Sequence, residues 1–291
     1  MNKYNIKKYS INKYNINDIF NKDYNNKLID SSSIIGYRRK RIKSGDYLEE
    51  EIYPIWNINV EGRTLRSKES TLIQKNLNNK NSVKNIIRLL NTNFTNNDIW
   101  VTFTYDDKHL PSSIEEAQKD MVNYIRRLKR YISKNKLYEL KYIYVSVFNE
   151  KRAHHHIVLN FNNRDIVEQL WNKASRKHTR RLQPNDLGLE EMGRYIMKEA
   201  KVSKYLRKYV VSKNLIKPLI SISDTIISKN KAFNLATNDI SPKVLFERVN
   251  KGYVFNSIRV YVSDYVSGVY IYIKMYKMGK NDNLWKRLNS S

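Results

Sequence analysis

Alternating hydrophobic and polar positions predict β-strands in several parts of the chain. Two strand-like segments flank a turn at Lys43–Asp46, which favours a β-hairpin over residues 34–56. In residues 98–107 alternate side chains fall on opposite faces, so that Trp100 and Val101 point in opposite directions. The remaining predicted strands cover residues 140–150, 154–161 and 268–278.

Apolar residues spaced three and four positions apart predict helices between these strands. The clearest helix lies within residues 110–136, where Ser113 and Glu116 form a capping-box pattern at its start. Its apolar stripe consists of Ile114, Ala117, Met121, Ile125, Leu128 and Ile132. Further helical patterns occur before residue 93, at residues 165–174 and at residues 187–200.

The order of these elements is strand, helix, strand, strand, helix, helix, which predicts an α+β fold. We expect a central antiparallel β-sheet with helices packed on one face. No internal repeat or Gly/Pro-rich linker divides the chain. The sequence therefore favours one domain over residues 34–291, preceded by a basic and weakly ordered N-terminal arm, residues 1–33.

Charge adds a functional constraint, because 54 Lys+Arg against 28 Asp+Glu give a formal net charge of +26. An excess of this size predicts a polyanionic partner, most commonly nucleic acid, with affinity that falls as salt rises. A basic protein without a nucleic-acid role is the alternative. No glycine-rich phosphate loop is present, so no nucleotide cofactor is expected.

Cysteine usage and hydropathy constrain the cellular compartment in which we expect the protein. The absence of cysteine excludes disulfides and thiolate metal sites, and fits a reducing compartment. No apolar segment approaches the roughly 20 residues that span a bilayer. The first 20 residues also lack the features of a secretory signal. The expected location is the cytoplasm, with no membrane partner.

Three of the five histidines stand together as His154, His155 and His156. On a strand, His154 and His156 would project from one face and His155 from the other. At roughly 3.3 Å rise per residue, the pair would lie about 7 Å apart along the strand and could converge on one divalent cation. Exposed histidines that merely line a strand edge are the alternative.

Metal chemistry on phosphate also needs a nucleophile, and Tyr195 has a suitable context. Lys198 follows it by three residues and Glu191 precedes it by four, so all three would share one helix face. A phenol must lose its proton to attack phosphorus, and a nearby ammonium and a metal-polarised phosphate would favour that attack. An ordinary amphipathic-helix tyrosine is the alternative.

Three segments in this order resemble the motif core of rolling-circle replication initiators of the HUH-endonuclease superfamily. More narrowly, they resemble replication proteins of phages and plasmids of Gram-positive bacteria and mollicutes. The first motif is matched by Thr102, Thr104 and Tyr105, the second by His154 and His156, and the third by Tyr195 and Lys198. Flanking segments are also similar, so the resemblance covers roughly residues 34–280, with the motif core at about 98–218.

The chain departs from the family pattern at three places. His155 replaces the hydrophobic residue usual between the histidines. Many relatives carry a metal-ligating Glu on the preceding strand, where this chain has Ser146 and Val147; Glu150, nearer the turn, is the candidate third ligand. Glu199 stands where some relatives have a second tyrosine, which favours a single-tyrosine enzyme. The fallback nucleophiles are Tyr205 and Tyr209.

The resemblance implies an RRM/ferredoxin-like HUH fold, with the N-terminal hairpin and helix as an extension. It also implies metal-assisted transesterification on single-stranded origin DNA. His154 and His156 would hold Mg²⁺ or Mn²⁺, while Tyr195 would attack the scissile phosphate. The products would be a 5′-phosphotyrosine and a free 3′-OH, with Lys198 neutralising the phosphate. A host helicase and polymerase would complete replication in the bacterial cytoplasm.

Basic residues on the central predicted helix and at the turn before the histidines are candidates for DNA-backbone contacts. They are Arg126, Arg127, Lys129, Arg130 and Arg152. A solvated helix face is the alternative for the first four. Three other functions remain open: a relaxase or single-strand transposase with the same chemistry, a non-catalytic DNA-binding regulator, and an RNA-binding protein.

Overall fold

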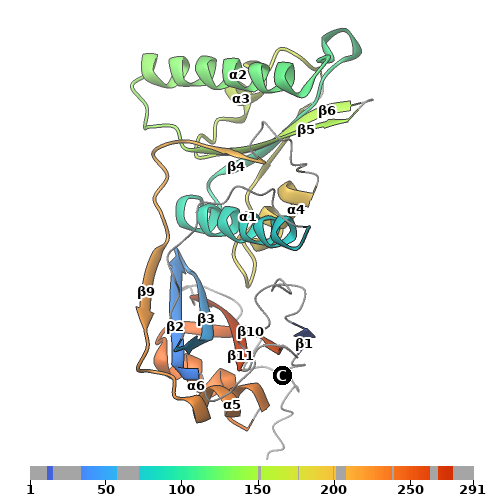
Figure 1. Ribbon diagram of the computed structural model, residues 1–291. Coiled ribbons are helices and arrows are strands. Elements are labelled where there is room, and N and C mark those ends of the chain that lie inside the picture. The colour runs from blue at the N-terminus through green and yellow to red at the C-terminus, as the bar shows by residue number, and fades with distance from the viewer. Residues whose placement is uncertain are drawn as a thin grey trace, which may run out of the picture. The chain divides into compact units, whose positions relative to one another are not determined.

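The computed structural model describes residues 12–15, 34–57, 72–149, 152–175, 177–198, 200, 208–237, 239–262 and 268–277. The chain forms two compact units (Figure 1). The motif unit comprises residues 83–217, and the terminal unit comprises residues 1–82 and 218–291. Of the predicted N-terminal arm, the structure describes only β1 (Asn12–Asn15).

The motif unit contains a five-stranded antiparallel sheet in the order β7-β4-β6-β5-β8. The strands are β4 (Ile99–Phe103), β5 (Tyr142–Asn149), β6 (Arg152–Leu159), β7 (Lys177–Arg181) and β8 (Val210–Val211). The three central strands, β4, β6 and β5, confirm the strands predicted from the sequence. The edge strands β7 and β8 were not predicted, because five and two residues are too short to show a period.

Helices cover both faces of this sheet (Figure 1). On one face, α2 (Ile114–Lys134) and α3 (Arg164–Gln169) pack with the apolar side chains of the strands. On the other face lie α4 (Glu190–Lys198) and the second half of α1 (Leu72–Asn93). A short 3₁₀ helix, η4 (Asp107–His109), follows β4. The α+β class is therefore confirmed, but the expectation of helices on one face alone was wrong.

The start of α2 confirms the predicted capping signal, with one difference. Ser113 Oγ accepts a hydrogen bond from the Glu116 backbone N at 3.2 Å. The Glu116 carboxylate accepts from Ser112, at 2.7 Å from its backbone N and 2.8 Å from its Oγ. The carboxylate thus caps the residue before Ser113 rather than Ser113 itself. The predicted apolar stripe is buried from Ala117 to Ile132.

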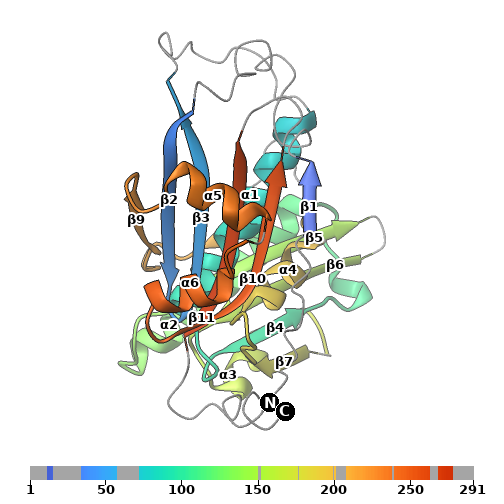
Figure 2. The same cartoon turned by 90° about the horizontal axis from the view of Figure 1, so that it is seen from below.

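The terminal unit contains a six-stranded sheet in the order β1-β10-β11-β3-β2-β9. Its strands after β1 are β2 (Ile34–Ser44), β3 (Tyr47–Trp56), β9 (Leu219–Ser223), β10 (Tyr253–Val262) and β11 (Val269–Lys277). β1 pairs in parallel with β10, and the other pairs are antiparallel. Helices α5 (Lys229–Thr237) and α6 (Pro242–Val249) contribute to its core (Figure 2). The predicted β2–β3 hairpin is confirmed.

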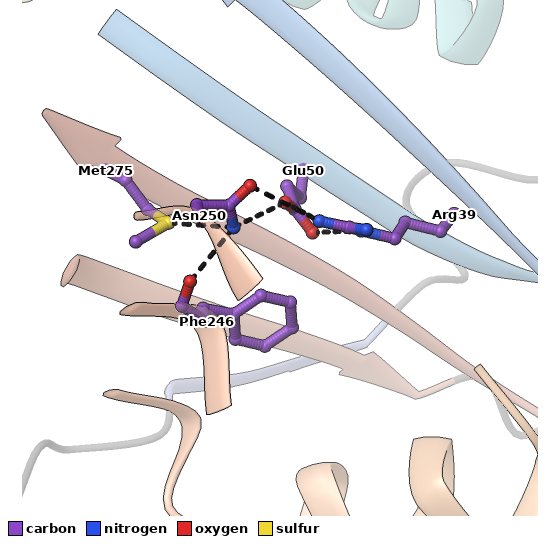
Figure 3. A network of polar contacts seen from close by, with 5 residues as sticks. All are labelled: Arg39, Glu50, Phe246, Asn250 and Met275. Carbon is purple, nitrogen blue, oxygen red and sulfur yellow. Dashed lines mark hydrogen bonds and ion pairs between the residues drawn. The ribbon is translucent and has the colours of Figure 1, made fainter. Parts of the chain in front are cut away.

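A buried ionic network joins β2, β3, β11 and the end of α6 in this unit (Figure 3). Glu50 is fully buried and pairs with the Arg39 guanidinium, whose Nε lies 2.6 Å from Oε2. Asn250 Nδ2 donates to Glu50 Oε1 at 2.8 Å and to the Phe246 carbonyl at 3.0 Å, and lies 3.5 Å from Met275 Sδ. The partners offset the cost of burying the Glu50 charge.

Candidate active site

Three motif segments meet on the α4-facing side of the motif-unit sheet. On β6, the rings of His154 and His156 lie 4.9 Å apart between centroids. The Tyr195 ring on α4 lies 5.3 Å from the His156 ring. The Trp100 ring on β4 lies 5.7 Å from Tyr195 and 6.4 Å from His156. Residues that are far apart in the sequence therefore form one cluster of side chains.

His156 is held by the strand beside it. Thr102 on β4 is its register partner, and Thr102 Oγ1 lies 3.0 Å from His156 Nδ1. His156 is only 4% exposed. When Nδ1 carries the proton, it donates a hydrogen bond to the Thr102 hydroxyl oxygen. A hydrogen bond of this kind fixes both the tautomer and the orientation of a histidine that ligates a metal.

His155 points to the opposite face and is completely buried there. Its Nδ1 lies 2.8 Å from Ser146 Oγ, and its Nε2 lies 2.8 Å from the Tyr105 hydroxyl. Burial, with smaller contributions from His154 and His156, lowers the pKa of His155 to about 3. His155 is therefore a neutral histidine in the core, with both ring nitrogens hydrogen-bonded. Ser146, which stands near the family's third-ligand position, is its partner.

The candidate third ligand, Glu150, lies outside the described residues. On β5, the residues opposite His154 and His156 are Val147 and Val145, which offer no ligand atom. Within the described ranges, no three His, Asp or Glu side chains come close enough to hold one metal ion. The described donor set is thus the two imidazoles of His154 and His156.

Close helix packing sets the position of Tyr195. A Cβ added at Gly193 would lie 2.6 Å from Ile87 Cγ1, so this glycine lets α4 approach α1 closely. Just before α4, the Leu189 backbone N donates to Asn91 Oδ1 at 2.9 Å. Tyr195 is 52% exposed, and Lys198, the last residue of α4, is also exposed. The nucleophile candidate is accessible while its helix is anchored.

The structure describes only one of the two fallback nucleophiles, Tyr209. Tyr205 lies outside the described residues. The Tyr209 hydroxyl accepts a hydrogen bond from Asn85 Nδ2 at 2.7 Å, which joins the segment before β8 to α1. Of the two nucleophile candidates that the structure describes, Tyr195 and Tyr209, only Tyr195 has a ring contact with His156.

The structure separates most of the predicted DNA contacts from the histidine pair. Arg126, Lys129 and Arg130 are exposed on α2, which covers the face opposite to His156. Arg127 instead donates to the Leu170 carbonyl, at 3.2 Å from Nε and 3.1 Å from Nη2. Arg152, at the start of β6, is exposed and lies on the histidine strand.

Other residues on the histidine face were not predicted as site residues from the sequence. Trp100 is partly exposed and contacts both His156 and Tyr195. On β7, His178 pairs with Thr102 and Arg180 pairs with Trp100. The run of basic residues from Lys177 to Arg181 was the available signal. Only the register of β7 on the sheet shows which of these side chains share a face with His156.

A comparison with known families matches the part of the chain that contains the motif segments. A family model of replication-associated proteins, of the ORF2 type, matches residues 98–214. No curated protein and no solved structure gave a match to the chain. Among the described helices, none is both long and apolar enough to cross a membrane. Residues 98–214 are therefore similar to this family of replication-associated proteins.

Proposed function

We propose that the motif unit is a tyrosine HUH endonuclease that initiates rolling-circle DNA replication. Its substrate would be single-stranded DNA at a replication origin, in the cytoplasm of a bacterial host. The observation that carries the proposal is the cluster of His154, His156 and Tyr195 on one face, with ring separations of 4.9 and 5.3 Å. The family match over the same segment supports it.

The proposed reaction is a transesterification. The Tyr195 hydroxyl attacks the scissile phosphorus, so that a Tyr195 Oη–P bond forms and the P–O3′ bond breaks. The phenolic proton leaves to solvent or a neighbouring base, and the departing 3′ oxygen is protonated. The products are a 5′-phosphotyrosine and a free 3′-OH that primes synthesis. Lys198, one turn along α4, would neutralise charge on the phosphate.

His154 and His156 would hold a divalent cation, which when bound polarises the scissile phosphate and stabilises charge in the transition state. The described donors fit this role, because both imidazoles project from the same face of β6 and the Thr102 hydroxyl, 3.0 Å from His156 Nδ1, would orient the His156 ring. Nitrogen donors favour Mn²⁺ over Mg²⁺, since Mg²⁺ prefers oxygen ligands. Glu150 stays the candidate for an oxygen ligand.

Host proteins would supply the remaining steps of replication. The nicking reaction needs no nucleotide cofactor, because the phosphotyrosine bond retains the energy for strand joining. A host helicase would unwind the duplex and a host polymerase would extend the 3′-OH. A relaxase or single-strand transposase would use the same chemistry, and a non-catalytic regulator would bind the origin without cutting it.

A covalent-adduct assay tests the proposal. The protein is incubated with a labelled single-stranded origin oligonucleotide and Mn²⁺, then denatured. We expect a denaturation-resistant adduct with the native protein and with Tyr209→Phe, and none with Tyr195→Phe or after chelation of the metal. Absence of an adduct with the native protein would leave DNA binding without nuclease activity. An adduct that persists in Tyr195→Phe would move the nucleophile, first to Tyr209 or Tyr205.

A further inference from the structure

A basic strand forms one edge of the motif-unit sheet, beside the candidate site. β7 has the sequence Lys-His-Thr-Arg-Arg and lies at the end of the strand order, with β4 as its neighbour. Lys177, Thr179 and Arg181 alternate with His178 and Arg180 along the strand. Because alternate side chains point to opposite faces, His178 and Arg180 share one face.

Strand register places that shared face on the side of the candidate active site. His178 is the partner of Thr102, which in turn pairs with His156. Arg180 is the partner of Trp100, whose ring contacts Tyr195. Cross-strand partners project from the same face of a sheet. Arg180, Trp100 and Tyr195 therefore follow one another across this face.

Both β7 side chains on this face are available to a ligand. His178 and Arg180 are exposed. Across the described part of the chain, neither forms an ion pair or a side-chain hydrogen bond. In contrast, Arg194 on α4 is paired with Glu190 at 2.6 Å. Arg180, unlike Arg194, therefore has a guanidinium that is available to an anion.

We propose that Arg180, assisted by His178, binds a phosphate of the single-stranded DNA that flanks the scissile phosphate, and that Trp100 stacks on an adjacent base. This inference rests on the proposed function, because it specifies where the substrate strand enters that site. A guanidinium matches phosphate with two parallel hydrogen bonds. Aromatic side chains next to basic ones are typical of surfaces that bind single strands.

Salt-dependent binding tests the inference, with Tyr195→Phe as the parent so that binding is measured without cleavage. Each backbone phosphate contact to single-stranded DNA contributes about 0.7 to the slope of log affinity against log salt. We expect Arg180→Gln to weaken binding of the origin oligonucleotide about tenfold and to reduce this slope by about 0.7. Arg180→Lys, which keeps the charge, should restore the slope.

Arg181→Gln is the matched control, because Arg181 is also exposed on β7 but projects from the opposite face. We expect it to leave the slope unchanged. An unchanged slope in Arg180→Gln, or an equal decrease in both variants, would overturn the inference. Tighter binding of an oligoribonucleotide of the same sequence would overturn the assignment to DNA.

The binding and adduct experiments together distinguish failure of this inference from failure of the proposed function. If the native protein forms an adduct but Arg180→Gln leaves the slope unchanged, the β7 contact is wrong and the nuclease stands. If no adduct forms while Arg180→Gln still lowers the slope, β7 binds a strand that the protein does not cut.

Discussion

The two faces of the motif-unit sheet are built from the same strands but have opposite character. On β6, His155, Ile157 and Leu159 are buried on the α2 side. His154 and His156 point to the α4 side, where Tyr195 is 52% exposed. One face is closed by packing, whereas on the other face the Tyr195 side chain is exposed to solvent.

The comparison shows that neighbouring residues of one type can have different physical roles. Both nitrogens of His155 are satisfied by Ser146 and Tyr105, and burial lowers its pKa so that this imidazole stays neutral. The surroundings of His154 and His156 are instead Thr102, Trp100 and Tyr195. We therefore expect substitutions on the α2 face to change stability, and substitutions on the α4 face to change activity.

The largest effect should separate His155 from His154. His155→Ala removes a completely buried ring and its hydrogen bonds with the hydroxyls of Ser146 and Tyr105, so it should lower the free energy of unfolding by about 3 kcal/mol. His154→Ala should change it by less than about 1 kcal/mol, because this side chain is partly exposed. Urea denaturation measures both.

The same two variants should differ in the opposite sense in the adduct assay. His154→Ala should lose metal-dependent adduct formation while it remains folded. His155→Ala should retain adduct formation in proportion to its folded fraction. Equal destabilisation by the two substitutions would contradict the division between the faces.

Gly193→Ala tests the helix packing behind the α4 face. Alanine favours a helix by about 1 kcal/mol over glycine. Its Cβ, however, would lie 2.6 Å from Ile87 Cγ1, and overpacking of this kind costs about 3 kcal/mol. The net expectation, from these two values, is a loss of about 2 kcal/mol in thermal or urea unfolding, with reduced adduct formation. Gly36→Ala, where nothing lies within 4 Å of the added Cβ, is the control and should be nearly neutral.

Thr102→Val should affect metal binding more than folding. The valine keeps the shape of Thr102 but removes the hydroxyl that lies 3.0 Å from His156 Nδ1. Loss of such an orienting bond weakens metal affinity by about tenfold or more. The apparent Mn²⁺ constant for adduct formation should rise accordingly, and Thr102→Ser should restore it. An unchanged constant in Thr102→Val would mean that Thr102 does not orient His156.

The smallest effect separates two arginines of α2. Arg127→Ala removes the hydrogen bonds to the Leu170 carbonyl that join α2 to the end of α3, and should cost about 1 kcal/mol. Arg130→Ala should change stability by no more than about 0.5 kcal/mol, because Arg130 is exposed. Denaturation curves of the two variants compare them directly. A larger cost for Arg130→Ala would contradict the structural role assigned to Arg127.

Local patterns were sufficient where a single element is long enough to show its own period. The stripe from Ala117 to Ile132 and the cap at Ser113 predicted α2 correctly. The alternation in β4 and β6 correctly placed Val101 opposite Trp100, and His155 opposite His154 and His156; the structure shows that Val101 and His155 are the buried ones. The candidate pair His154 and His156 followed from the same alternation. In each case, the information lies in side chains a few residues apart.

The register between distant strands could not be predicted from the sequence. The Ser146 and Tyr105 bonds of His155 depend on the alignment of β5 and of the segment that follows β4, which no local pattern determines. The place of Arg180 beside Trp100 depends on β7, whose five residues are too few for a reliable period.

By itself the sequence determined the strands of the sheet's centre, the helix α2, the strong positive charge and the likeness that singled out Tyr195. Tertiary structure decided which of these residues meet. Backbone hydrogen bonds between strands set Thr102 beside His156, and the close approach of α4 to α1 at Gly193 brings the Tyr195 ring to 5.3 Å from His156. Periodicity is a property of neighbours in the chain, whereas a site depends on packing between segments that are far apart in it.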